Sequence, residues 1–262
     1  MLTTRITLRI SNGRLLLAVA DASVASQVSF EPVIVKSGIS MAANLRAAFN
    51  ESALLQHGYH RAQVMLDTPV ILVPVEEFHE DQASVLYHHA IFGRDNDEVL
   101  HTILPELNSV ALYSINKDMR LVLTDHFSDI RFLPLMMPVW RHMNQRSFTG
   151  SYRKLYGYFH DKKVEVFAFD KTRFRFCNAF DAAHSHDAVY FLLYVWRELG
   201  MDAHRDELHL AGELPDREEL LATLRSYVQK AYVINPMAEF NRAPIAQVKG
   251  MPFDMISLYI RK

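Results

Sequence analysis

The segment 184–187 reads His-Ser-His-Asp and places two imidazoles, a hydroxyl and a carboxylate close together. Imidazole and carboxylate are common ligands of zinc, so these residues could bind a metal ion. The same segment precedes a run with helical apolar periodicity, where Ser185 and Asp187 are ordinary helix-capping residues. Capping is therefore the preferred interpretation, and metal binding is the alternative.

Other groups that could do chemistry have a simpler structural explanation. His88 and His89 are neighbours on an expected helix and point about 100° apart, so they do not converge on one ion. The acids at 76–81 are typical of a solvated helix start, and Lys162-Lys163 is typical of a solvated hairpin tip. The single cysteine, Cys177, lies in an apolar run and is interpreted as an inert core thiol. No Gly-x-Ser-x-Gly, Walker A or Gly-x-Gly-x-x-Gly motif is present.

Composition indicates a well-buried globular protein. Of 262 residues, 50% are hydrophobic and 22% are charged, which suits one large or two modest domains. The formal charge of −2 comes without a basic block, so nucleic acid is not an expected partner. There is no uncharged apolar run long enough to span a membrane. The first 20 residues contain Arg5, Arg9 and Arg14 and do not resemble a signal peptide, so we expect a cytoplasmic protein.

The N-terminal residues predict a three-stranded meander followed by a helix. The pair Asn12-Gly13 separates the alternating segment 6–10 from the apolar run 15–20. Such a pair predicts a hairpin with a type I′ turn, which needs positive φ at both central residues. Pro32 places the third strand at a sheet edge or a bulge, and Ser40 is expected to cap the helix.

The remaining elements follow from apolar periodicity and from Gly and Pro punctuation. The expected strands are residues 27–35, 63–66, 70–73, 155–159, 164–169, 173–177, 207–210 and 231–234, with 110–115, 121–124 and 130–135 as strands or short helices. The expected helices are residues 80–91, 138–144 and 187–199 (with Gly200 as C-cap), and two that begin at Pro215 and Pro252. The polar residues 145–150 mark the expected boundary between domains 1–150 and 151–262.

The second domain repeats the pattern of the first. Shifting the numbering by 149 lays residues 5–21 over residues 154–170 without a gap. Ile6 then matches Leu155, and Asn12-Gly13 matches Asp161-Lys162. Both copies continue with a third strand and an amphipathic helix, which indicates an internal duplication.

This order of elements resembles the actin, Hsp70 and sugar-kinase superfamily. The second half shows it most clearly, with three strands, a helix, a strand and a helix in residues 154–230. More narrowly, the chain looks like a bacterial family of domains of unknown function with that fold, and pilus-assembly and type II secretion proteins of the superfamily are also similar. The resemblance implies an α/β fold with mixed sheets, made of two ribonuclease H-like halves in the actin-like ATPase arrangement.

The resemblance also implies where nucleotide phosphates would bind. Superfamily ATPases hold them between the first two strands of each half, where an Asp-x-Gly supplies a carboxylate for Mg²⁺ and backbone N–H groups for phosphates. Here the first copy reads Ser11-Asn12-Gly13, which keeps the glycine and lacks the acid. The second reads His160-Asp161-Lys162, with the acid displaced by one residue and no glycine. Both turns are expected to be two-residue hairpins, which argues against hydrolysis.

An adenosine motif of the superfamily, a strand that ends in glycines before a helix, resembles residues 208–213 with one glycine kept. Gly212 either makes an ordinary strand-to-helix turn or marks a vestigial or working nucleotide pocket. If the resemblance holds in detail, six residues gather around one cavity as cofactor-binding candidates: Asn12, Gly13, Asp161, Lys162, Gly212 and Glu213. We expect this cleft to be closed, with Asp161 and Lys162 satisfied locally at a solvated tip.

These features favour a catalytically degenerate protein that binds another protein or itself, without a cofactor. The alternative is an ATP-binding, sugar-kinase-like phosphotransferase with unconventional phosphate loops, which would use Mg-ATP. A ribonuclease H-like nuclease ranks third, because Asp21 and Asp170 follow second strands and no acid lies on the first strands. The apolar segment 132–140 is either core or a surface for a partner.

Overall fold

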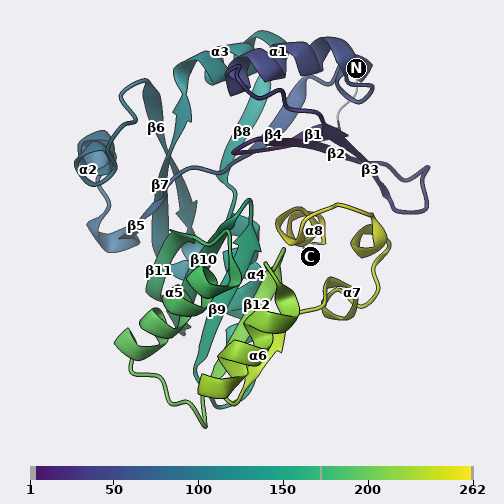
Figure 1. The fold of residues 1–262 in the computed structure, drawn as a ribbon. Coiled ribbons are helices and arrows are strands. Elements are labelled where there is room, and N and C mark those ends of the chain that lie inside the picture. Colours follow the sequence, from purple (N-terminus) through teal and green to yellow (C-terminus); the bar gives the residue numbers. More distant parts are fainter. Residues whose placement is uncertain (1–3, 172, 261–262) are drawn as a thin grey trace. The chain divides into compact units, whose positions relative to one another are not determined.

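The structure is a computed structural model that describes residues 4–171 and 173–260. The chain forms two compact units, of which unit 1 comprises Met1–Pro138 and Gln247–Lys262 and unit 2 comprises Val139–Ala246. The chain therefore passes from one unit to the other twice, after Pro138 and after Ala246. Each unit combines helices with a mixed sheet (Figure 1), which confirms the predicted fold class.

The main sheet of unit 1 has the strand order β3-β2-β1-β4-β8. The first three strands are antiparallel neighbours, and β4 and β8 run parallel to β1. The strands are β1 (Arg5–Ser11), β2 (Arg14–Ala20), β3 (Val28–Val33), β4 (Arg61–Leu66) and β8 (Asp129–Pro134). Helices α1 (Met41–Glu51) and α3 (Lys117–His126) share an apolar core with one face of this sheet.

Local signals in this sheet act as the sequence predicts. The Ser40 hydroxyl accepts a hydrogen bond from the backbone N–H of Ala43 at 3.2 Å and so caps α1. Pro32 lies in β3, which is an edge strand, where a missing N–H leaves no ladder bond unmade. Residues 121–124 belong to α3 rather than to a strand.

A three-stranded antiparallel sheet with the order β5-β7-β6 lies between β4 and α3 in the sequence of unit 1. Its strands are β5 (Ile71–Pro74), β6 (Asp97–Leu104) and β7 (Ser109–Asn116). Helix α2 (Ala83–Ala90) packs on it through the buried Ala83 and Tyr87. Sequence reasoning missed β6, because much of this strand is partly exposed and its residues form no clear apolar pattern.

The sheet of unit 2 has the order β11-β10-β9-β12-β13. Its strands are β9 (Lys154–His160), β10 (Lys163–Asp170), β11 (Arg173–Asp181), β12 (Glu207–Gly212) and β13 (Ala231–Val233). Its helices are α4 (Met137–Ser147), which begins in unit 1, α5 (Ser185–Glu198), α6 (Arg217–Tyr227) and α7 (Pro236–Glu239). Helices α5 and α6 share an apolar core with one sheet face.

Several predicted helix ends in unit 2 need correction. The residue that precedes α5 is His184, which makes no side-chain cap bond, so Ser185 is the first helical residue and not the cap. Pro215 stands before the N-cap Asp216 rather than in the first turn of α6. Gly200, with φ of 59°, ends α5 as predicted, and its N–H donates to the Arg197 carbonyl. Residues 145–147, within the predicted polar boundary, belong to α4, and the division at residue 150 stays a prediction.

The two five-stranded sheets share the same strand order and strand directions. Their first hairpins also share one register, because Ser11 pairs with Arg14 and His160 pairs with Lys163, each 149 positions later. Likewise Ile10 pairs with Leu66 on β4, and Phe159 pairs with Gly212 on β12. The register therefore follows the sequence offset, which supports the proposed internal duplication.

The second face of each main sheet carries polar groups. In unit 1, the fully buried Arg9 donates from Nε to both carboxylate oxygens of Asp254, at 3.1 and 2.9 Å. Asp254 belongs to α8 (Phe253–Tyr259), the helix that starts after Pro252 as predicted. The Tyr259 hydroxyl donates to the Thr7 hydroxyl at 2.9 Å. These bonds fasten the C-terminal helix to the first strand of unit 1.

Most of the apolar segment 132–140 is buried, and Phe132 and Leu133 are partly buried. Leu135, Met136, Met137, Val139 and Trp140 are all at most 3% exposed. Core packing therefore explains this segment, and the alternative of an exposed partner-binding surface is wrong.

Candidate functional site

The structure brings together four of the six predicted candidate residues, within unit 2. Asp161 and Lys162 form the turn between β9 and β10, and Gly212 ends β12. Gly212 pairs with Phe159, and the backbone N–H of Glu213 donates to the Phe159 carbonyl at 2.9 Å. All four therefore lie at one end of the unit 2 sheet. Asn12 and Gly13 belong to unit 1, and their gathering with the other four stays a prediction.

The hairpin of unit 1 closes tightly, as predicted. Ser11 pairs with Arg14, so Asn12 and Gly13 alone make the turn. Gly13 has φ of 75°, whereas Asn12 is not among the residues with positive φ, so the predicted type I′ turn is wrong. Glycine at the second position alone supplies the left-handed conformation that this turn needs. No acidic side chain belongs to the turn.

The hairpin of unit 2 adopts the conformation that was expected of the other one. Asp161 and Lys162 have φ of 47° and 63°, so both central residues are left-handed without a glycine. This is the backbone of a type I′ turn, and Asp tolerates it better than Lys does. His160 and Lys163 pair across it, so this loop is also only two residues long.

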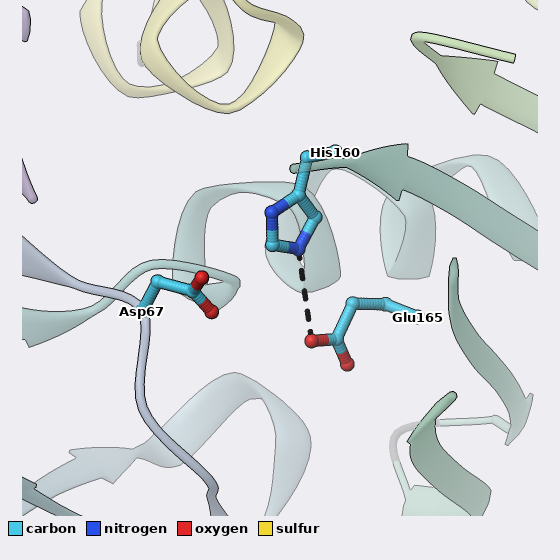
Figure 2. Close-up of side chains that lie close together, drawn as sticks. All are labelled: Asp67, His160 and Glu165. Carbon is cyan, nitrogen blue, oxygen red and sulfur yellow. Dashed lines mark ion pairs between the residues drawn. The ribbon is translucent and has the colours of Figure 1, made fainter. Parts of the chain in front are cut away.

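A buried imidazole is held between two carboxylates beside this turn. His160 Nδ1 lies 3.1 Å from Asp161 Oδ2, and His160 Nε2 lies 3.7 Å from Glu165 Oε1, the pair marked in Figure 2. The side chains of His160 and Asp161 are only 2% and 1% exposed. Asp67, which Figure 2 also draws, belongs to unit 1 and is not part of this pair.

The burial of Asp161 corrects one expectation. We expected Asp161 and Lys162 to be satisfied together at a solvated tip, but only Lys162 is exposed. The Asp161 carboxylate faces an imidazole instead. Sequence reasoning missed the roles of His160 and Glu165. His160 pairs with Lys163, and Glu165 lies two residues beyond Lys163 on β10, so both side chains are on the same face of the hairpin.

Gly212 is required by the backbone. Its φ is 93°, and a Cβ at this position would lie 2.0 Å from the Phe159 carbonyl oxygen. Only a residue without a side chain fits such a close approach of two parallel strands. The backbone therefore accounts for this glycine, and the choice between an ordinary turn and a nucleotide pocket stays a prediction.

A cavity of about 200 Å³ opens beside Gly212. It lies at the carboxyl ends of the parallel strands β12 and β13, where open α/β sheets commonly bind ligands. Asn235 caps α7 by accepting from the Met237 N–H at 3.0 Å, and Arg217 is the first residue of α6. The lining residues are Gly212, Leu214, Arg217, Val233, Ile234, Asn235 and Pro236. The lining combines apolar side chains with the polar Asn235 and one cationic side chain, Arg217.

Sequence reasoning missed most of this cavity. The pair Asn235-Pro236 signalled only the end of a strand, and Arg217 is one arginine among many. The lining residues come from β12, α6, β13, α7 and the loops between them, and no local spacing reveals that they face a common space. The signal that was available was Gly212, which the strand-to-helix pattern singled out.

A partly buried ionic cluster connects α4 to α7 in unit 2. Glu239 accepts from Arg146 at 2.6 Å and lies 2.7 Å from His142 Nε2. The hydrogen bond with His142 and the nearby Arg146 charge hold the pKa of the Glu239 carboxyl below its ordinary value. The cluster can hold these two elements together, which is a structural role.

A second polar group lies on the adjacent strands. His209 Nε2 lies 2.8 Å from Glu207 Oε2, and burial lowers the pKa of His209 although Glu207 opposes the shift. Burial also raises the pKa of the neighbouring Tyr156 hydroxyl. These groups face the side of the sheet opposite to the apolar core, because Glu207 and His209 alternate with the core residues Leu208 and Leu210.

The other groups singled out by type have local contacts or surroundings that fit a structural role. Burial of its thiol raises the pKa of Cys177 well above the ordinary value, which agrees with an inert thiol. Asp21 accepts hydrogen bonds from Ser23 and Ser29, which lower the pKa of its carboxyl. The His184 and His186 rings stack at 5.4 Å near the start of α5.

Comparison with known protein families assigns the chain to one of them. Residues 3–231 match the family described as "Protein of unknown function (DUF3822)". The chain belongs to this family. No curated protein matches the sequence. The predicted membership in a family of domains of unknown function is thereby confirmed.

Comparison with solved structures identifies the fold of this DUF3822 chain. A protein of Bacteroides thetaiotaomicron, described as having an actin-like ATPase fold and unknown function, is similar with a TM-score of 0.84 and 26% identity. The similarity covers 99% of this chain and 96% of that one. A chain of the PilM–PilN type IV pilus biogenesis complex has a TM-score of 0.53 and 10% identity, over 90% and 89% of the two chains. The chain has the actin-like ATPase fold. Among the residues described, no helix has the length and apolar character needed to cross a membrane.

Proposed function

We propose that this DUF3822 chain is a non-catalytic member of the actin-like fold that acts by binding another protein. The observation that carries the proposal is the length of its two first hairpins. Each turn consists of two residues between directly paired strand ends, Ser11 with Arg14 and His160 with Lys163. A turn this short supplies few free N–H groups for a phosphate.

The chemistry of the turns supports the same conclusion. The first turn has no acid, and the Asp161 carboxylate of the second is buried against His160. A Mg²⁺ shell would therefore lack the carboxylate that the fold usually provides. Each lost charge-assisted hydrogen bond weakens binding by roughly 1.5–3 kcal/mol, so the loss of two lowers affinity for Mg-ATP by at least about a hundredfold.

A thermal-shift titration with Mg-ATP tests the proposal. We expect millimolar Mg-ATP to leave the Tm unchanged, within the shift produced by Mg²⁺ alone. A ligand present at about 100 times its Kd stabilises a protein by about 2.7 kcal/mol, which is a rise of several degrees. A rise of that size that disappears with EDTA would contradict a degenerate nucleotide site.

The second candidate is an ATP-binding phosphotransferase, and the cavity beside Gly212 favours it. The superfamily holds adenosine near the corresponding strand end, and Arg217 could meet a phosphate there. The cavity of about 200 Å³ is smaller than typical ligand pockets of about 300–1,000 Å³. An increase in Tm with adenosine that the space-filling substitution Leu214→Trp removes would favour this function.

Protein partners fit the proposal better than small molecules do. The solved PilM–PilN complex contains a chain with this fold in an assembly with another protein. We propose the same kind of role here, with self-association as the alternative and the cytoplasm as the expected location. The surface that would serve it is derived below.

A further inference from the structure

Negative charge is concentrated in one part of unit 1. Residues 75–108 contain eight carboxylates and one arginine, a formal charge of −7, whereas the whole chain carries −2. Two carboxylates are paired, Asp97 with Arg94 and Glu98 with Arg120. Other acids here are exposed and have no ion-pair partner in the described part of the chain: Glu77, Glu80, Asp81 and Asp95. Three of these four, Glu77, Glu80 and Asp81, lie within the six residues before α2 begins at Ala83.

The same segment exposes apolar side chains. Of the fourteen exposed large apolar side chains among the described residues, five lie in residues 75–103. Val85 is 73% exposed on α2, and Phe92, two residues beyond the helix, is 84% exposed. Leu86 and Ile103 are also exposed. Five such residues within one short stretch of sequence are unusual, since single exposed apolar residues are normally scattered.

The packing of α2 explains why these residues face outward. Tyr87 and Ala83 fill the inward side of the helix, against Val73, Val110 and Leu112 of the small sheet. Tyr87 is anchored further, because its hydroxyl donates to the Pro69 carbonyl at 2.9 Å. Val85, Leu86 and His89 then lie on the outward side, since residues at those positions are rotated away from Tyr87. Figure 1 shows α2 at the outer side of the small sheet.

We propose that this α2 surface, defined as Val85, Leu86 and Phe92 with Glu77, Glu80 and Asp81, docks a basic amphipathic helix of another protein. The proposal rests on the proposed protein-binding function and assigns it a surface and a partner chemistry. The partner's apolar stripe would cover Val85, Leu86 and Phe92. Its Lys or Arg residues would face the acids at the start of α2, which complement positive charge.

Charge selects this occupant over the others. Two copies of the chain that met through α2 would bring together the exposed acids Glu77, Glu80 and Asp81 of both copies, so self-association through this surface is opposed at neutral pH. Nucleic acid and anionic membranes are repelled for the same reason. A basic helix is the complementary partner that also offers apolar area.

Binding of a designed probe to the full-length chain tests the proposal. The probe is a fluorescent helical peptide of about five turns with a Leu stripe and Lys elsewhere, and its counterpart carries Glu in place of Lys. Fluorescence anisotropy measures the Kd of each at low and high salt. We expect the Lys peptide to bind, the Glu peptide not to bind, and high salt to weaken the binding.

Matched variants locate the binding surface. The double variant Val85→Ser/Phe92→Ser should weaken binding of the Lys peptide at least about tenfold, whereas Leu121→Ser, on the exposed side of α3, should leave it unchanged. The variant Glu80→Gln/Asp81→Asn should weaken binding and reduce its salt dependence, and Glu51→Gln at the end of α1 should not. Circular dichroism checks that each variant is folded.

Several outcomes would overturn the proposal. These are no binding of the Lys peptide, equal binding of both peptides, equal weakening by Leu121→Ser, or a dimer in sedimentation that Val85→Ser disrupts. The Mg-ATP titration is independent of all of them. If the peptide experiment fails while Mg-ATP leaves the Tm unchanged, only the surface assignment falls and the non-catalytic function stands.

Discussion

Replacing Gly212 with alanine tests the geometry on which the unit 2 site depends. The added Cβ would lie 2.0 Å from the Phe159 carbonyl oxygen, and φ at this residue is 93°. That oxygen also accepts the N–H of Glu213, so the backbone cannot yield without loss of a hydrogen bond. The pairing of β9 with β12 must therefore open at the end where the candidate residues lie.

Two effects set the expected magnitude. Holding a non-glycine residue in this conformation costs about 1–3 kcal/mol. Relieving the overlap with the Phe159 carbonyl adds roughly 1–3 kcal/mol, as for other overpacked sites. The total of about 2–6 kcal/mol corresponds to a fall in Tm of roughly 4–12 °C, at about 2 °C per kcal/mol for a chain of this size.

Gly200→Ala is the matched control in the same unit. Gly200 also has positive φ, of 59°, but a Cβ there would meet nothing within 4 Å. Its replacement should destabilise the chain by only about 1–2 kcal/mol, the cost of the left-handed conformation. Urea unfolding followed by circular dichroism measures both variants. A Gly212→Ala variant as stable as Gly200→Ala would refute the close approach of β12 to Phe159.

Two further predictions concern buried charge. Asp254→Asn should lower the free energy of unfolding by about 3–5 kcal/mol, because the buried Arg9 would keep its charge without a carboxylate partner. The double variant Arg9→Met/Asp254→Leu should recover most of this lost stability, and urea unfolding measures both variants. Burial lowers the folded-state pKa of His209 below the value of about 6.5 in the unfolded chain, so below that pH the unfolded chain binds the proton more readily and stability falls. Between about pH 7 and the lowered folded-state pKa, His209→Gln should therefore lose less stability than the wild type does. The exposed His89→Gln should behave like the wild type. Equal pH profiles for wild type and His209→Gln would contradict the lowered pKa of His209.

Local patterns predicted much of the fold. Alternation at 6–10 and the apolar run at 15–20 predicted both strands of the first hairpin, and the 149-residue offset agrees with the register of both hairpins. Ser40, Pro32 and Gly200 act as predicted because capping, edge placement and helix termination depend on neighbouring backbone groups. The strand β6 was missed because its partly exposed residues form no clear apolar pattern.

The candidate site was predictable only in part. Gly212 and the turn Asp161-Lys162 stood out by residue type, but the roles of His160 and Glu165 did not. The type I′ conformation that was predicted for Asn12-Gly13 is found at Asp161-Lys162 instead. Nothing local predicted the cavity lined by Arg217 and Asn235, or the ionic cluster of Glu239.

Sequence patterns alone predicted most of the strands and helices, the two tight first hairpins and the 149-residue offset between them. Each of these follows from interactions among residues near in the chain, which periodicity and turn chemistry record. Only the tertiary structure decided that α8 returns to unit 1 and pairs Asp254 with Arg9, and that β12 approaches Phe159 so closely that Gly212 has no substitute. Those contacts join residues far apart in the chain, and their free energy depends on packing and register that no local pattern encodes.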